Sequence, residues 1–247
     1  MRLMQAQYAQ YLEQYAQLAR QLRDAPEPQI VIVKSAKARS SAPKRLGVLS
    51  GSFNPPTNAH VELLRRAQVA YSLDECMLLL AIANVDKPIF GAPLEHRLLM
   101  MCILARGHPN WSVALSSHGR FVDKAQAIIH TYPTPFDLFF IVGYDTLVRI
   151  FDPKYYTDPN RELQMLFEHA QLIVANREPY AVKDIHSFMK HPLCAPFVKR
   201  IHILELPECF ASLSSTTVRE VLKSGGDIVN MVPHQIAQMI RTFNLYA

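Results

Sequence analysis

The stretch LGVLSGSFNPPTNAHVELLRRA, residues 46–67, joins an apolar run to an amphipathic segment through a loop that contains glycine and proline. The run Leu46–Leu49 has the length and composition of a buried strand, and Ala59–Tyr71 has the spacing of a helix. Gly51 lets a phosphate approach the backbone, and the start of the helix offers free N–H groups to an anion. The stretch therefore predicts a strand, loop and helix unit that binds phosphate.

Further apolar runs follow along the chain, and helical patterns separate several of them. The clearest helical pattern is Leu94–Arg106, because Pro93 stands where a helix can begin. The apolar runs have the character of buried parallel strands, and they are Met77–Ala81, Trp111–Leu115, Leu138–Val142, Leu172–Ala175 and Ile201–Leu206. Strands that alternate with helices predict an α/β fold, a Rossmann-like doubly wound parallel sheet with its ligands at the carboxyl ends of the strands.

The N-terminal residues do not show the alternation of apolar runs and helical patterns that follows Leu46. Residues 1–24 predict a helix with an apolar and aromatic stripe, formed by Tyr8, Tyr11, Tyr15, Leu18 and Leu22. Residues 24–43 form either a linker or an added strand. We therefore divide the chain into an N-terminal helical extension with its linker, residues 1–45, and a catalytic domain, residues 46–247.

Two helices are expected at the C-terminal end. The first runs from Thr217 to Lys223, with Thr217 and Glu220 spaced as a capping pair and Gly225-Gly226 as its stop. The second follows Pro233.

Composition sets wider limits. No apolar run approaches the roughly 18 to 20 residues that a membrane-spanning helix needs, and we expect a soluble, intracellular protein. The four cysteines are scattered without a C-x-x-C pair, which favours reduced core thiols over metal ligands. A net charge of +5 and a pI of about 9.0 suit an anionic partner without distinguishing nucleic acid from nucleotides.

A second candidate phosphate site lies far along the chain. Ser214-Ser215-Thr216-Thr217-Val218-Arg219 stands at a predicted helix start, where hydroxyl and N–H groups can bind triphosphate oxygens. Arg219 adds a fixed fork of donors. We expect the α/β fold to bring this segment and the Gly51 loop to one edge of the sheet.

Three motifs give the chain a family resemblance. GSFNPPTNAH, residues 51–60, resembles the GxFNPxTxxH signature of eukaryotic nicotinamide mononucleotide adenylyltransferases, a branch of the HxGH nucleotidyltransferases. IVGYDTL, residues 141–147, is similar to the family's strand that ends in Gly-x-Asp, and SLSSTTVREVL, residues 212–222, resembles its ISSTxIR motif. The resemblance runs from Leu46 to the end in the family's order and is strongest to divergent fungal members. It implies a nucleotidyltransferase-type fold.

The resemblance also implies roles for single residues. His60 matches the second histidine of HxGH, which with Arg219 stabilises the reacting phosphates, and Thr57 takes the place of the first. The implied ATP-binding residues are Gly51, Ser52, Phe53, Thr57, His60, Gly143, Asp145, Ser215, Thr216, Thr217 and Arg219. Those implied for the mononucleotide are Ser52, Phe53, Lys87 and Trp111. Trp111 would stack on the pyridine ring, although the stacking position could instead fall near residues 116–118.

The implied reaction joins ATP to a pyridine mononucleotide and releases pyrophosphate. The attacking phosphate is already an anion and needs no general base, so the work of the site is positioning and charge stabilisation. Mg²⁺ would be held mainly by the ATP phosphates and water, without a protein metal site. We expect a cytoplasmic or nuclear location and no nucleic-acid or membrane partner, and leave a homo-oligomer open.

Two alternatives remain open from the sequence. One keeps the reaction but uses another phosphorylated acceptor. The other is a nucleotide-binding protein with an interaction or chaperone-like role, whose surface would be the tyrosine-rich N-terminal helix. Intact His60 and Arg219 argue against the second.

Overall fold

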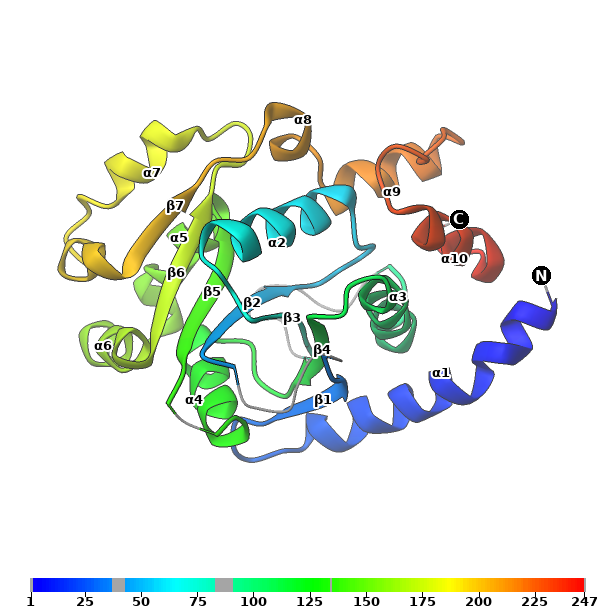
Figure 1. Ribbon diagram of the computed structural model, residues 1–247, viewed down its shortest axis with the longest axis horizontal. Coiled ribbons are helices and arrows are strands. Elements are labelled where there is room, and N and C mark those ends of the chain that lie inside the picture. Colours follow the sequence, from blue (N-terminus) through cyan, green and yellow to red (C-terminus); the bar gives the residue numbers. More distant parts are fainter. Residues whose placement is uncertain (1, 37–42, 83–90, 134, 247) are drawn as a thin grey trace.

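The computed structural model describes residues 2–36, 43–82, 91–133 and 135–246. Within these ranges seven strands form one sheet in the order β1-β4-β3-β2-β5-β6-β7 (Figure 1). All neighbouring strands are parallel except β1 and β4, which are antiparallel. The strands are β1 Ile30–Lys34, β2 Arg45–Gly51, β3 Glu75–Ala81, β4 Trp111–Ser116, β5 Asp137–Gly143, β6 Ala170–Ala175 and β7 Ile201–Leu204.

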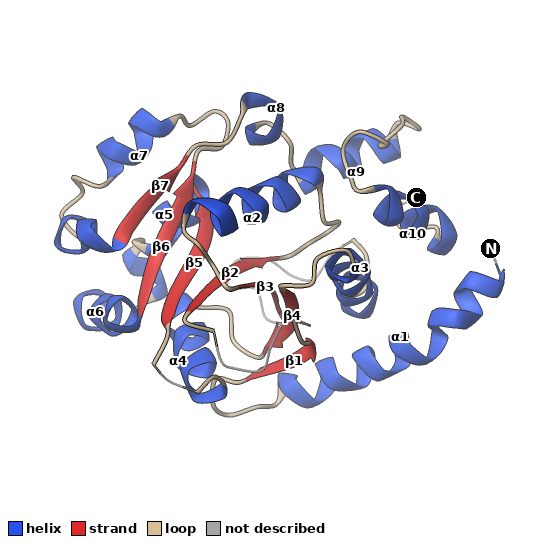
Figure 2. Ribbon diagram, in the orientation of Figure 1, coloured by secondary structure: helices blue, strands red, loops and turns tan. Residues whose placement is uncertain are grey.

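Helices cover both faces of the sheet (Figure 2). The core of one face joins the strands to α1 Arg2–Arg23, α2 Asn58–Ala70, α3 Leu94–Arg106, α9 Ser215–Lys223 and α10 His234–Phe243. The core of the other face joins them to α4 Phe121–Thr131, α5 Tyr144–Ile150, α6 Pro159–His169 and α7 Val182–Phe188. The shorter elements are η1 Pro153–Tyr155, η2 Ala195–Arg200 and α8 Glu208–Ala211. Because the central strands are covered on both sides, they consist almost wholly of buried residues.

This architecture confirms the predicted α/β class. Each of the six predicted strands is present, and the helices expected at Ala59–Tyr71 and Leu94–Arg106 appear as α2 and α3. The chain begins the parallel sheet at β2, builds outward through β3 and β4, and then returns to place β5 on the other side of β2. The strand order therefore reverses between β2 and β5, where a doubly wound sheet opens a crevice at its carboxyl edge.

The N-terminal extension packs against the rest of the chain. Of the two readings of residues 24–43, the added strand is correct, since β1 pairs with β4 through Ile30 and Ser116. Helix α1 buries Tyr8 and Tyr15 in the core that contains α3, and the Tyr15 hydroxyl lies 3.6 Å from the Cys102 sulfur. Helix α1 and strand β1 thus share their cores with the domain predicted to begin at residue 46.

The start of α9 differs from the prediction. The helix begins at Ser215, and Ser214 in an extended conformation is its N-cap, with its Oγ accepting from the Thr217 N–H at 3.0 Å. The predicted cap by Thr217 with Glu220 is therefore wrong, because Ser214 already satisfies the first turn. The predicted stop is confirmed, since Gly225 has a φ of +74° just beyond the helix.

Two predictions from composition can also be compared with the described residues. Cys76, Cys102 and Cys194 are buried free thiols, whereas Cys209 on α8 is exposed and is not a core residue. No helix in the described ranges has both the length and the apolar character to cross a membrane.

Candidate active site

A cleft with a volume of about 400 Å³ lies at the carboxyl edge of the sheet. Its floor includes the ends of β2, β5 and β6 at Gly51, Gly143 and Ala175. Its walls come from both faces of the sheet, with α2 and α9 on one and α4 and α5 on the other. The cleft therefore occupies the place that the reversal of strand order predicts for a ligand.

The two predicted phosphate-binding segments meet at this cleft. The Ser215 hydroxyl donates to the Pro55 carbonyl at 2.8 Å, and Arg219 Nη1 donates to the Asn54 carbonyl at 2.7 Å. These bonds fasten the start of α9 to the loop after β2, although the partners are 160 and 165 residues apart in sequence. The expectation that the fold brings both segments to one edge of the sheet is confirmed.

The loop after β2 is also held from its other side. Asn54 is 1% exposed, and its Oδ1 accepts from the Ala92 N–H at 3.1 Å. Gly91, which precedes Ala92, has a φ of +78°. A Cβ at Gly91 would lie 2.6 Å from the Asn54 side chain, so only glycine fits. These contacts hold Asn54, and with it the loop, against the segment that contains Gly91 and Ala92.

His60 is oriented by the N-cap of α2. Its Nδ1 accepts the Thr57 backbone N–H at 3.0 Å, so the proton of the neutral ring is on Nε2. Burial, together with the nearby Arg177 guanidinium, lowers the pKa of His60 to about 4. His60, which lines the cleft, is therefore a neutral hydrogen-bond donor at physiological pH.

The lowered pKa has a consequence for stability. Between the ordinary histidine pKa of 6.5 and the folded value of about 4, the unfolded chain binds the proton and the folded protein does not. Stability is thus lost as pH falls through this window. In urea unfolding, His60→Gln should reduce the difference in unfolding free energy between pH 7 and pH 4.5 by on the order of 2 kcal/mol. An unchanged difference would contradict the lowered pKa.

The cleft is strongly basic. In the described part of the chain six cationic side chains line it, namely Arg97, Arg120, Lys124, Arg149, Arg177 and Arg219. Within the same ranges one carboxylate lines it, that of Asp145, which pairs with Arg177 Nε at 3.5 Å. This balance suits a ligand with several negative charges.

Most of the residues predicted for the site line the cleft: Gly51, Ser52, His60, Gly143, Asp145, Ser215, Thr216 and Arg219. Lys87 lies outside the described residues. Phe53 is buried and packs its ring 5.3 Å from that of His60, which leaves its backbone as the only part that could meet a substrate.

Two of the predicted ATP contacts need correction. Thr57 is fully buried, and its Oγ1 lies 2.7 Å from His60 Nδ1, so it supports His60 from behind. Thr217 is absent from the lining of the cleft, because its N–H and its hydroxyl both bond to the Ser214 side chain.

The predicted role of Trp111 in stacking on the pyridine ring also needs correction. It is the first residue of β4 and so lies at the amino end of the strand, away from the edge that forms the cleft. Its side chain is 1% exposed, stacks on His108 at 3.8 Å and donates from Nε1 to Gln68. It has no face left for a pyridine ring and is a core residue. The alternative segment, residues 116–118, lies at the carboxyl end of β4, immediately before Gly119 and Arg120 of the cleft.

A substitution at Trp111 separates packing from binding. Trp111→Phe should lower the melting temperature, since it removes buried atoms and the hydrogen bond to Gln68. It should leave the KM for the acceptor within about threefold of wild type, because the indole does not reach the cleft. A rise in KM of tenfold or more without loss of stability would restore Trp111 to the site.

Sequence reasoning missed most of the cations. Arg97, Lys124 and Arg149 lie on helices, where a charged residue usually marks a solvated face. Arg177 offered a usable signal, because it follows the end of a predicted strand by two residues. Such positions converge at the carboxyl edge of a parallel sheet.

Comparison with known proteins agrees with this geometry. Residues 48–221 match the family model described as cytidylyltransferase-like. A Schizosaccharomyces pombe protein named "Putative nicotinamide mononucleotide adenylyltransferase" is 31% identical over 220 residues, which cover 82% of this chain and 86% of that protein. A Citrifermentans bemidjiense protein named "Probable nicotinate-nucleotide adenylyltransferase" is 25% identical, covering 82% of this chain and 98% of that one.

A solved structure supports the fold. Plasmodium falciparum nicotinic acid mononucleotide adenylyltransferase, complexed with NaAD, superposes with a TM-score of 0.61 at 19% identity. The match covers 82% of this chain and 97% of the other.

Proposed function

Because this chain belongs to the cytidylyltransferase-like family, we propose that its cleft transfers the adenylyl group of ATP to a pyridine mononucleotide and releases pyrophosphate. The observation that carries the proposal is the joining of the loop of His60 to the helix of Arg219 at one basic cleft. Both segments resemble phosphate-handling motifs, and their union provides one place for a triphosphate.

The reaction follows from the chemistry of that place. A phosphate oxygen of the mononucleotide attacks the α-phosphorus of ATP and forms a new P–O bond. The bond from that phosphorus to the oxygen bridging to the β-phosphate breaks, and pyrophosphate leaves with the electron pair. The attacking oxygen is already anionic, so no side chain has to remove a proton.

The protein has to stabilise negative charge and align two anions. The Nε2–H of neutral His60 donates to the phosphates without adding a charge that would bind the substrates too firmly in the ground state. Arg219 and the N-termini of α2 and α9 supply further fixed donors. The hydrogen bonds from Ser215 to the Pro55 carbonyl and from Arg219 to the Asn54 carbonyl keep these donors in place during the reaction.

Mg²⁺ would enter with ATP. The described residues contain no group of three or more His, Cys, Asp or Glu side chains placed to hold a metal ion. Asp145, the one carboxylate that lines the cleft among the residues the structure describes, already pairs with Arg177. Phosphate oxygens and water would supply the ligands, and they match the preference of Mg²⁺ for oxygen and for partial hydration. Bound there, the ion would neutralise charge on the leaving pyrophosphate.

The test is a pyrophosphate-release assay with ATP and Mg²⁺. It should be run with nicotinamide mononucleotide, with nicotinate mononucleotide, with phosphopantetheine and with no acceptor. Release that requires a pyridine mononucleotide, with formation of the matching dinucleotide, is the expected result. Release only with phosphopantetheine would assign another acceptor, and ATP binding without release under any condition would refute an enzymatic role.

A further inference from the structure

Lys124 is a buried cation that forms no ion pair with any carboxylate of the described residues. It lies in the first turn of α4, lines the cleft and is 5% exposed. Its Nζ donates to the Gly119 carbonyl at 2.5 Å and lies 4.7 Å from the centre of the Phe121 ring. Among the described residues no carboxylate lies within ion-pair distance of it.

The surroundings of Lys124 make this arrangement costly. The adjacent carboxylate of Asp123 is turned to Arg120, from which it accepts two hydrogen bonds. Burial lowers the pKa of Lys124 to about 8, an effect that Asp123 opposes and Arg149 reinforces. The ammonium group is still charged at neutral pH, and a buried charge without an ion-pair partner is unfavourable. An anionic group of a ligand in the cleft would remove that cost.

The position of Lys124 shows which part of the ligand it would meet. Helix α4 packs on the face of the sheet opposite to α2 and α9, which carry His60 and Arg219. The transferred phosphates belong at the His60 and Arg219 end. The end near Lys124 is instead lined by the aromatic residues Phe121, Tyr155 and Tyr156, which suit a flat ring.

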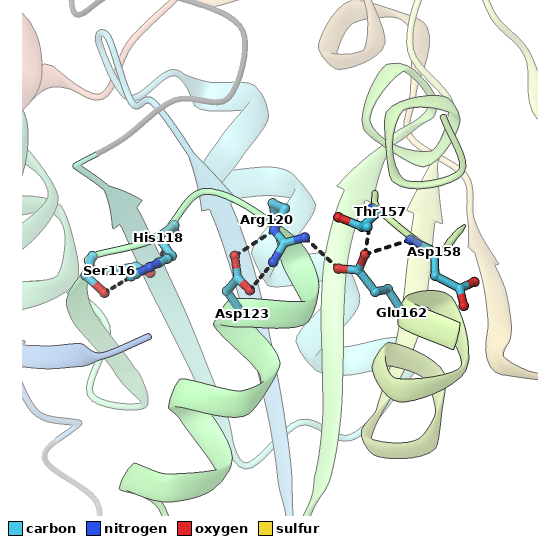
Figure 3. Close-up of polar contacts among 8 residues, drawn as sticks. Ser116, His118, Arg120, Asp123, Thr157, Asp158 and Glu162 are labelled. Carbon is cyan, nitrogen blue, oxygen red and sulfur yellow. Dashed lines mark hydrogen bonds and ion pairs between the residues drawn. The ribbon is translucent and has the colours of Figure 1, made fainter. Parts of the chain in front are cut away.

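This end of the cleft is also preorganised. Figure 3 shows Arg120 between Asp123 and Glu162, with its Nη1 donating to Glu162 at 2.5 Å. Glu162 also accepts the backbone N–H groups of Thr157 and Asp158, which directly follow Tyr155 and Tyr156. Because these contacts join the loop after β4 to the loop after α5, the two walls are fixed relative to each other.

We propose that Lys124 pairs with the 3-carboxylate of nicotinate mononucleotide, and that this protein prefers the acid acceptor over the amide. The inference rests on the proposed function. The acceptor carries two anionic groups, and its phosphate has to lie beside the α-phosphorus at the opposite end. The ring carboxylate is the group left for the cation among the aromatic residues, and the uncharged carboxamide cannot form the ion pair.

The test compares kcat/KM for nicotinate and nicotinamide mononucleotides. Wild type should prefer the acid by about tenfold or more. Lys124→Met keeps the approximate length of the side chain without its charge. This variant should lower kcat/KM for the acid by about tenfold or more, and should change kcat/KM for the amide by less than about threefold. Lys124→Gln is a second neutral variant in case the first does not fold. Lys183→Met, an exposed lysine of α7 outside the cleft, is the matched control and should change neither value.

Each other outcome has a defined meaning. A wild type that uses both acceptors equally, or prefers the amide, overturns the pairing but leaves the adenylyltransferase proposal intact. Equal losses for both acceptors in Lys124→Met would also overturn it, because they would show a role unrelated to the carboxylate. No turnover of either mononucleotide by wild type would refute the proposed function itself.

Discussion

Replacement of His60 by alanine should lower kcat by about 10² to 10³-fold, the usual cost of removing one donor to a developing negative charge. The ring is held by the Thr57 N–H and lines the cleft as a neutral donor, so its loss removes a preorganised hydrogen bond to the reacting phosphates. Steady-state turnover with ATP and the better mononucleotide measures the effect.

A second substitution at the same position separates catalysis from folding. His60 occupies the third position of α2, where glutamine commonly returns a hydrogen bond to the N-cap backbone. His60→Gln should therefore keep more of the stability than His60→Ala while losing as much activity. A kcat within about threefold of wild type in either variant would remove His60 from the mechanism.

Arg219→Ala should lower kcat/KM for ATP by about 10² to 10³-fold. Arg219 lines the cleft and also bonds to the Asn54 carbonyl and the Thr216 hydroxyl, so alanine removes both a phosphate donor and a support of the loop. Arg219→Lys keeps the charge but has no planar fork, and it should recover only part of the loss.

The matched control for this experiment is Arg241→Ala. Arg241 on α10 is 65% exposed and pairs only weakly with Asp227 at 3.5 Å, outside the cleft. Its removal should leave kcat/KM unchanged. Wild-type activity in Arg219→Lys would show that a point charge suffices, and wild-type activity in Arg219→Ala would exclude the α9 segment from the mechanism.

The sequence alone determined the sheet and the position of the site. The apolar runs from Leu46 to Leu206 have the length of strands and are separated by helical patterns, so they predict a parallel sheet covered on both faces. Gly51, His60 and Arg219 stand in local patterns next to the ends of these elements. Since the carboxyl ends of parallel strands share one edge, such local information was enough to place them together.

Only the tertiary structure decided the state of individual side chains. Trp111 is a core residue because of His108 and Gln68, and Lys124 is a buried cation because α4 turns it into the cleft. The strand at residues 30–34 is likewise defined by its partner β4. Periodicity shows which face of an element is apolar, but burial, pKa and hydrogen-bond partners depend on atoms that distant segments bring close. Those contacts exist only once the chain has folded.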